Sequence, residues 1–185
     1  MIRYALLVRG INVGGKNKVV MAQLRQELTE LRLENVEAYI NSGNIFFDTN
    51  IPRIQLVEDL KGFFEVHYPF VQSFSLFSKE DYEEELRNLP DWWSHEMARK
   101  DVLFYTEGLD MNQVIEKVNS LELVDEVLHF GRLGIFWGKL SEATYSKTAY
   151  HKHLLKMPFY RNITIRNANT FDKIGQFLKQ KERDN

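Results

Sequence analysis

Glycine and polar residues gather in an early segment that could bind an anion. Residues 9–18 contain three glycines beside the cations Arg9, Lys16 and Lys18. The segment is expected between a strand and a helix, where main-chain N–H groups and the positive end of the helix can hold a phosphate or carboxylate. Its spacing matches neither the Walker pattern nor the Rossmann glycine triplet. The same glycines could serve only to let a tight loop reach its helix.

Two later segments carry residues of the same kinds. Residues 41–44 read Asn-Ser-Gly-Asn, which can orient a ligand, although a tight turn favours these residue types whatever its function. Residues 164–170 contain Arg166, whose planar guanidinium can clamp a carboxylate or phosphate or form an ordinary ion pair. In that segment Asn169 or Thr170 can cap the helix that is expected to follow.

Other kinds of catalytic or metal site are not predicted. His151 and His153 are two residues apart, so on a helix they point in different directions, and no acid stands nearby at metal-ligand spacing. Ser42 is not in a nucleophile-elbow context, and no histidine or aspartate can be assigned to it. No metal is therefore expected, and the sequence identifies no cofactor.

The anion-binding segments must be positioned by strands and helices whose patterns can be read along the chain. In the first half, apolar periodicity and turn residues predict the order β-α-β-β-α-β. The predicted strands are residues 3–8, 36–40, 45–48 and 71–77, and the predicted helices are residues 21–33 and 54–64. An acidic helix that begins after Ser78 then leads to a boundary at residues 90–93.

The second half repeats the same order. Strands are predicted at residues 102–105, 126–130, 134–137 and 163–166, and helices at residues 110–121, 147–157 and 170–181. The order is that of the ferredoxin-like fold, so we predict an α+β protein of two successive units with antiparallel or mixed sheets. The predicted domains are residues 1–90 and 91–185. Whether the two units exchange strands or pack as one body stays open.

The predicted topology places two of the candidate segments side by side. In a ferredoxin-like unit the first and second strands run in the same direction, so the loop after the first strand and the turn after the second lie at one end of the sheet. Residues 9–18 and 41–44 should therefore share one rim. The second unit has no comparable glycine-rich loop, so the first unit should carry the site.

Composition indicates the class of protein and its expected location. With 44% hydrophobic residues and 4 prolines among 185 residues, the chain can bury a substantial core. It has no cysteine and no apolar run near the roughly 20 residues of a membrane-spanning helix. Its first residues lead into a glycine-rich turn instead of a signal-cleavage site. A cytoplasmic protein that does not insert into membranes is the expectation.

Three motifs closely resemble a bacterial family known as domain of unknown function 1697. They are residues 5–17 (Ala-Leu-Leu-Val-Arg-Gly-Ile-Asn-Val-Gly-Gly-Lys-Asn), residues 39–44 (Tyr-Ile-Asn-Ser-Gly-Asn), and residues 164–167 (Thr-Ile-Arg-Asn) with Thr170. The resemblance implies a stand-alone bacterial α+β protein and brings no activity. The family pattern singles out Arg9, Gly10, Asn12, Gly14, Gly15, Asn17, Asn41, Ser42, Gly43, Asn44, Arg166, Asn167 and Thr170.

Three functions are compatible with these observations. The first is binding of a small phosphate-bearing or other anionic ligand, by Arg9, Gly10, Asn12, Gly14, Gly15, Asn17, Asn41, Ser42, Asn44, Arg166 and Asn167. No general base is evident, which favours binding over catalysis and leaves it undecided whether the protein is an enzyme. Any enzyme would have to work largely through electrostatics and positioning.

The second function is binding of RNA or single-stranded nucleic acid. Residues 147–181 carry many cations and only one acid, and they interleave these cations with Tyr150, Phe159 and Tyr160. Solvated helix faces would give the same charge pattern. A net charge of −2 and an isoelectric point near 6.2 argue against this function. The third function is protein interaction, including self-association, and the sequence leaves the oligomeric state open.

Overall fold

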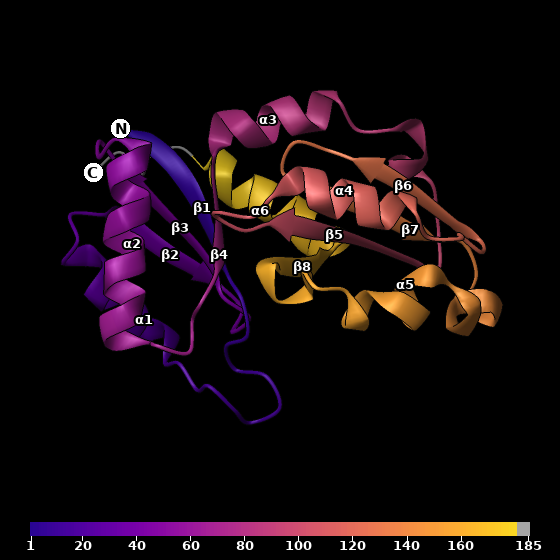
Figure 1. Ribbon diagram of the computed structural model, residues 1–185. Helices are drawn as coiled ribbons and strands as arrows, with labels where there is room; N and C mark the ends of the chain where they lie inside the picture. The colour runs from indigo at the N-terminus through magenta and orange to yellow at the C-terminus, as the bar shows by residue number, and fades with distance from the viewer. Residues whose placement is uncertain (181–185) are drawn as a thin grey trace.

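The first half of the chain forms one four-stranded antiparallel sheet with two helices. The structure is a computed structural model that describes residues 1–180 (Figure 1). The strands are β1 (Ile2–Val8), β2 (Glu34–Tyr39), β3 (Asn44–Thr49) and β4 (Phe74–Ser78), and the helices are α1 (Met21–Thr29) and α2 (Arg53–His67). The spatial order β2-β3-β1-β4 is that of a ferredoxin-like unit, which confirms the predicted topology.

The second half forms a second antiparallel sheet with the equivalent spatial order β6-β7-β5-β8. Its strands are β5 (Arg99–Tyr105), β6 (Glu126–Phe130), β7 (Gly134–Lys139) and β8 (Ile163–Asn167). Its helices are α4 (Met111–Asn119), α5 (Ala149–His153) and α6 (Ala168–Lys179). The fold is therefore α+β with two ferredoxin-like units. The predicted end of the last helix at residue 181 lies outside the described residues.

The helix predicted over residues 147–157 is broken into shorter pieces. Only α5 is α-helical, between the 3-10 turns η2 (Glu142–Lys147) and η3 (Leu154–Lys156). Thr148 caps the start of α5, and the buried Glu126, which is distant in sequence, accepts hydrogen bonds from the N–H groups of Ala149 (2.7 Å) and Tyr150 (2.9 Å). These contacts satisfy the first amides of α5 and set its start at Ala149 instead of residue 147.

A helix between the units and the last helix share a central layer. α3 (Lys79–Arg87) begins at Ser78 with a capping box, as predicted for an N-cap, and η1 (Asp91–Ser94) leads on to β5. α3 contacts α6, and both helices contact β1. In Figure 1, α6 lies between the two sheets. The boundary predicted at residue 90 falls in the connection between α3 and β5.

Successive side chains of a strand point to opposite faces of its sheet, and both faces of each sheet are buried. In β1, Leu6 and Val8 pack with α1 and α2, whereas Ala5 and Leu7 belong to a central cluster that also contains Phe104 from β5. The other face of the second sheet packs with α4 and the α5 segment. Neither sheet of the described residues therefore presents an open face, and the two units share a core. No helix within residues 1–180 is long and apolar enough to cross a bilayer.

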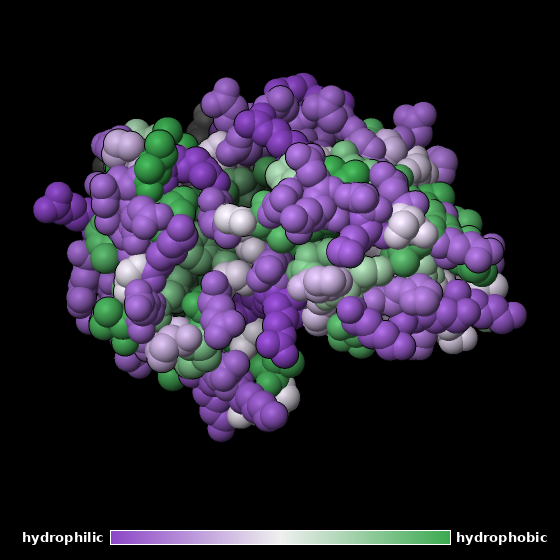
Figure 2. Space-filling model, in the orientation of Figure 1, coloured by the Kyte–Doolittle hydropathy of each residue, from purple (hydrophilic) through white to green (hydrophobic). Residues whose placement is uncertain are grey.

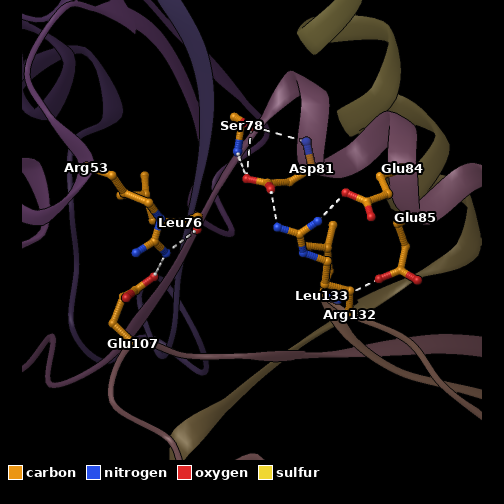
Figure 3. A network of polar contacts seen from close by, with 9 residues as sticks. All are labelled: Arg53, Leu76, Ser78, Asp81, Glu84, Glu85, Glu107, Arg132 and Leu133. Atoms are coloured by element: carbon orange, nitrogen blue, oxygen red, sulfur yellow. Dashed lines mark hydrogen bonds and ion pairs between the residues drawn. The ribbon is translucent and has the colours of Figure 1, made fainter.

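Two arginines link the units by ion pairs on one side of the molecule (Figure 3). Arg53 of α2 pairs with Glu107, which follows β5. Arg132, in the turn between β6 and β7, pairs with Asp81 at 3.2 Å and with Glu84, both on α3. These side chains are partly exposed, so each pair contributes little stability but restricts the relative orientation of the two units.

A buried carboxylate on α3 accepts a hydrogen bond from the β6–β7 turn of the second sheet. Glu85 is 1% exposed, and its Oε2 accepts a hydrogen bond from the Leu133 N–H at 2.5 Å (Figure 3). Its Oε1 has no hydrogen-bond partner among the described groups. A Cβ added at Gly131 would lie 2.5 Å from this oxygen, so the carboxylate packs directly on the turn. Burial raises the pKa of the Glu85 carboxyl above its usual range.

Candidate functional site

The glycine-rich loop after β1 forms a small hairpin that extends away from the body of the protein (Figure 1). Its tip is closed by a hydrogen bond from the Lys16 N–H to the Val13 carbonyl at 3.0 Å. Gly14 and Gly15 at the tip have φ angles of 57° and 74°, which only glycine adopts at little cost. Both residues are exposed. The structure therefore assigns them a turn conformation at the end of the loop.

Two asparagines hold this loop in shape. The Asn12 side chain accepts a hydrogen bond from the Val19 N–H (2.8 Å) and donates to the Asn41 carbonyl (2.9 Å). The Asn17 side chain donates to the Gly10 carbonyl at 2.9 Å. Asn12 and Asn17 adopt positive φ angles of 54° and 51°, which asparagine tolerates better than most residues. The bond from Asn12 to Asn41 joins the loop to the β2–β3 turn, as the strand directions predict.

The β2–β3 turn lies tightly against the end of β1. A Cβ added at Gly43 would lie 3.0 Å from the Val8 Cβ, and Gly43 has a φ angle of 85°. The Asn44 amide group donates to the Tyr39 carbonyl and to the Ser42 Oγ, both at 3.1 Å. Asn44 is buried, whereas Asn41 is exposed and Ser42 is half-buried.

Arg166 reaches from β8 into this turn and is almost completely buried. Its Nε donates to Asn44 Oδ1 at 2.6 Å, and its Nη2 donates to the carbonyls of Val8 (3.0 Å) and Ser42 (2.9 Å). Its Nη1 donates to Thr164 Oγ1 at 2.8 Å. All these acceptors are electrically neutral, and burial lowers the pKa of Arg166 to about 10. The guanidinium is thus hydrogen-bonded without a described counter-ion.

Arg166 extends from the second unit to the first, and Arg9 extends from the first unit to the second. Its Nη1 donates to the Ile163 carbonyl at 2.7 Å, and its guanidinium lies 4.6 Å from the centre of the Tyr160 ring. Arg9 and Arg166 therefore cross the boundary between the units in opposite directions. Among the described residues, the Arg9 side chain makes only this one hydrogen bond, so most of its N–H donors remain available.

These contacts bring two acid-free parts of the chain together. Residues 1–26 and 143–171 contain no aspartate or glutamate. Within the part of the chain that the structure describes, the salt bridges include none that involves Arg9, Lys16, Lys18, Arg161 or Arg166. Figure 2 shows strongly hydrophilic side chains where the lower part of the first unit meets the second. We call the surface formed by residues 9–18, residues 41–44 and Tyr160 the junction rim.

The structure divides the predicted site residues into three groups. Arg9, Gly10, Asn12, Asn17, Asn41, Ser42, Asn44 and Arg166 lie in or directly behind the junction rim, while Gly14 and Gly15 occupy its exposed tip. Asn167 is separate: its Oδ1 accepts a hydrogen bond from the Thr170 N–H at 2.9 Å and caps α6. The prediction that Asn169 or Thr170 caps this helix was therefore wrong, because α6 begins at Ala168 and both residues lie within its first turn.

Sequence reasoning missed one feature of the site region and one outside it. The contact between Arg9 and Tyr160 could not be predicted from the sequence, because the residues are 151 positions apart and no pattern links them. Outside the rim, the ion pair between Lys139 and Asp101 was also missed, since a lysine at the end of an apolar strand usually points into water. In residues 1–180, no group of three histidine, aspartate or glutamate side chains is arranged to hold a metal ion.

Comparisons with known proteins identify relatives of this chain. The family described as protein of unknown function (DUF1697) matches residues 1–136, so the match ends before the Arg166 motif. The solved structure of conserved bacterial protein SP0830 from Streptococcus pneumoniae is 75% identical, with a TM-score of 0.95, and the alignment covers 96% of this chain and 99% of that chain. No curated protein matches. The predicted resemblance is therefore confirmed, and the protein belongs to the DUF1697 family.

Proposed function

We propose that this protein binds a small phosphate-bearing or other anionic ligand at the junction rim. The observation that supports this function most strongly is the buried charge of Arg166, which is 9% exposed and hydrogen-bonded only to neutral groups. Transfer of a charge out of water is costly even when its hydrogen bonds are satisfied. An anion at the nearby surface would offset part of that cost.

The position of Arg166 suits a role behind the ligand. Its donors already have acceptors on Val8, Ser42 and Asn44, so it would act through its electric field and by holding the β2–β3 turn in place. A field from a buried charge is weakly screened by solvent and salt. Direct contacts with the ligand would come from Arg9, whose remaining N–H groups are free to donate, and from Asn41, which is exposed.

Binding without catalysis is the function that this geometry favours. The segments that form the junction rim contain no aspartate, glutamate or histidine that could act as a general base. The glycines of the loop tip give the chain its shape, and their main-chain N–H groups can add hydrogen bonds to an anion. We therefore describe the rim as a binding site for an oxyanion, with the rest of the ligand undefined.

Nucleic-acid binding receives less support. Phe159 is 6% exposed and belongs to the core beside the second sheet. The Tyr150 ring packs against Trp137, with 5.2 Å between ring centres. A ferredoxin-like domain that binds single-stranded RNA stacks bases on an open sheet face, and neither sheet of residues 1–180 has one. The cytoplasmic location remains a prediction from composition.

A thermal-shift screen tests the proposal. Purified protein would be heated with inorganic phosphate, sugar phosphates, nucleotides and simple carboxylates, because a ligand at about 100 times its Kd adds about 2.7 kcal/mol of stability. We expect a subset of these anions to raise the Tm of the wild type and of Arg87→Ala, which removes an exposed arginine on α3. In the Arg9→Ala variant the same anions should raise the Tm little. An equal response in Arg9→Ala would reject the junction rim as the site.

A further inference from the structure

A second cavity lies in the second unit, where β5 begins and β8 passes into α6. Its volume is about 480 Å³, which is large enough for a small metabolite. Its lining is mainly polar and includes Arg99, Asp101, Tyr145, Tyr150, Asn167 and Asn169. The side chains come from three separated parts of the chain, of which only residues 167–169 belong to a candidate segment of the sequence.

A fully buried lysine lies behind the wall of this cavity. Lys139 is 0% exposed, its Nζ lies 2.5 Å from Asp101 Oδ2, and the same Nζ lies 3.7 Å from the centre of the Tyr150 ring. Burial is the main cause that lowers the pKa of Lys139, and the Asp101 charge opposes it. Since Asp101 is paired with Lys139, its charge is largely neutralised toward the cavity.

The groups that remain available around the cavity are mostly hydrogen-bond donors. Arg99 stacks 3.7 Å from the centre of the Tyr145 ring and donates to Glu142 through Nε (3.0 Å) and Nη2 (3.2 Å), which leaves Nη1 free. The N–H groups of Ala168 and Asn169, in the first turn of α6, have no acceptor within the helix. The carboxylate of Glu142 is outside the residues that line the cavity.

We propose that this cavity binds a second small oxyanion, a carboxylate or phosphate group held by Arg99 and the Asn169 segment, while the buried Lys139 neutralises the Asp101 carboxylate in the cavity wall. The site is separate from the junction rim, because no residue that lines it belongs to that rim. A test of this cavity is therefore independent of the function proposed above. Tyr145 and Tyr150 also line the cavity, beside the proposed oxyanion position.

Titration of the labelled protein followed by ¹⁵N–¹H spectra tests the proposal. Inorganic phosphate and citrate serve as separate probes of the two oxyanion classes. We expect at least one probe to cause saturable shifts of the Ala168 and Asn169 amide signals. Removal of one charged donor in Arg99→Ala should weaken this binding about tenfold or more. A response to one probe only supports the site and identifies the oxyanion it prefers.

A second variant separates loss of binding from loss of structure. Asn169→Asp adds a negative charge to the first turn of α6, which favours the helix but repels an anion. We expect this variant to fold and to lose the saturable shifts, whereas Arg9→Ala should retain them. The proposal is overturned if neither probe gives saturable shifts at residues 168 and 169, or if Arg99→Ala and Asn169→Asp bind as the wild type does.

Discussion

The Nε of Arg166 donates a hydrogen bond to Oδ1 of Asn44 at 2.6 Å, between residues 122 positions apart in the chain. This bond joins the last strand of the second unit to the first residue of β3, directly after the β2–β3 turn. Asn44 in turn holds that hairpin through the Tyr39 carbonyl. The two residues therefore connect the packing of the two units directly to the shape of the junction rim.

Replacement of Arg166 by alanine should strongly destabilise the protein. The variant removes the donor from buried acceptors on Val8 and Asn44, at about 1–3 kcal/mol each, and from the half-buried Ser42 carbonyl, so we expect the free energy of unfolding to fall by at least about 3 kcal/mol. Urea denaturation measures this change. Arg161→Ala, which removes an exposed arginine from the same segment, should change stability by less than about 0.5 kcal/mol. Similar small losses in both variants would contradict the role assigned to Arg166.

Gly175 and Gly62 should respond in opposite ways to substitution by alanine. A Cβ at Gly175 in α6 would clash with the Tyr82 hydroxyl, whereas a Cβ at Gly62 in α2 would meet nothing within 4 Å. We expect Gly175→Ala to lower the free energy of unfolding by about 1–3 kcal/mol. Gly62→Ala should raise it by up to about 1 kcal/mol, since alanine favours helix. Thermal unfolding compares the two, and a stabilised Gly175→Ala would refute the close packing of α6 against α3.

Glu85→Gln should change how stability depends on pH. The folded-state pKa of Glu85 is raised, so between the unfolded value of about 4.3 and the folded value the native state binds more protons than the unfolded state. The contribution of Glu85 to stability therefore falls as pH rises through this window and is constant above it. Glutamine cannot ionise, so we expect Glu85→Gln to gain stability relative to the wild type as pH increases. Denaturation at several pH values measures the difference, and a difference that does not vary with pH would count against the raised pKa.

The Lys139 and Asp101 pair should show strong coupling in a double-mutant cycle. Lys139→Met leaves the Asp101 carboxylate without its partner, and loss of one member of a buried ion pair costs about 3–5 kcal/mol. The double variant with Asp101→Asn should lose less free energy of unfolding than Lys139→Met alone, because it contains no unpaired charge. Chemical denaturation of the wild type, the two single variants and the double variant gives the coupling energy. Additive losses would show that the two side chains do not depend on each other.

The fold was largely predictable because its elements follow simple periodic patterns. Alternation in β1 and helical spacing in α2 both depend on residues that are neighbours in sequence. The helix predicted from residue 147 begins at Ala149 instead, because Glu126, a distant residue, binds the first amides of α5. Local patterns cannot anticipate such a contact.

The site was less predictable because its polar residues bind main-chain atoms. Arg166 was identified as a candidate clamp for an anion, yet its acceptors include carbonyls of Val8 and Ser42, which any sequence would offer. The predicted meeting of residues 9–18 with residues 41–44 followed from strand direction alone, and Asn12 makes that contact. The roles of these residues in ligand binding stay predictions.

Calorimetric titrations with inorganic phosphate and, separately, with citrate test the anion site at the junction rim most directly. The titrations would use the Asn169→Asp variant as their background, so that binding in the second cavity does not contribute. We predict saturable binding of at least one of these anions, which Arg9→Ala weakens about tenfold or more and Arg87→Ala leaves unchanged. The absence of saturable binding of either anion, or equal affinity with and without Arg9, would contradict the account.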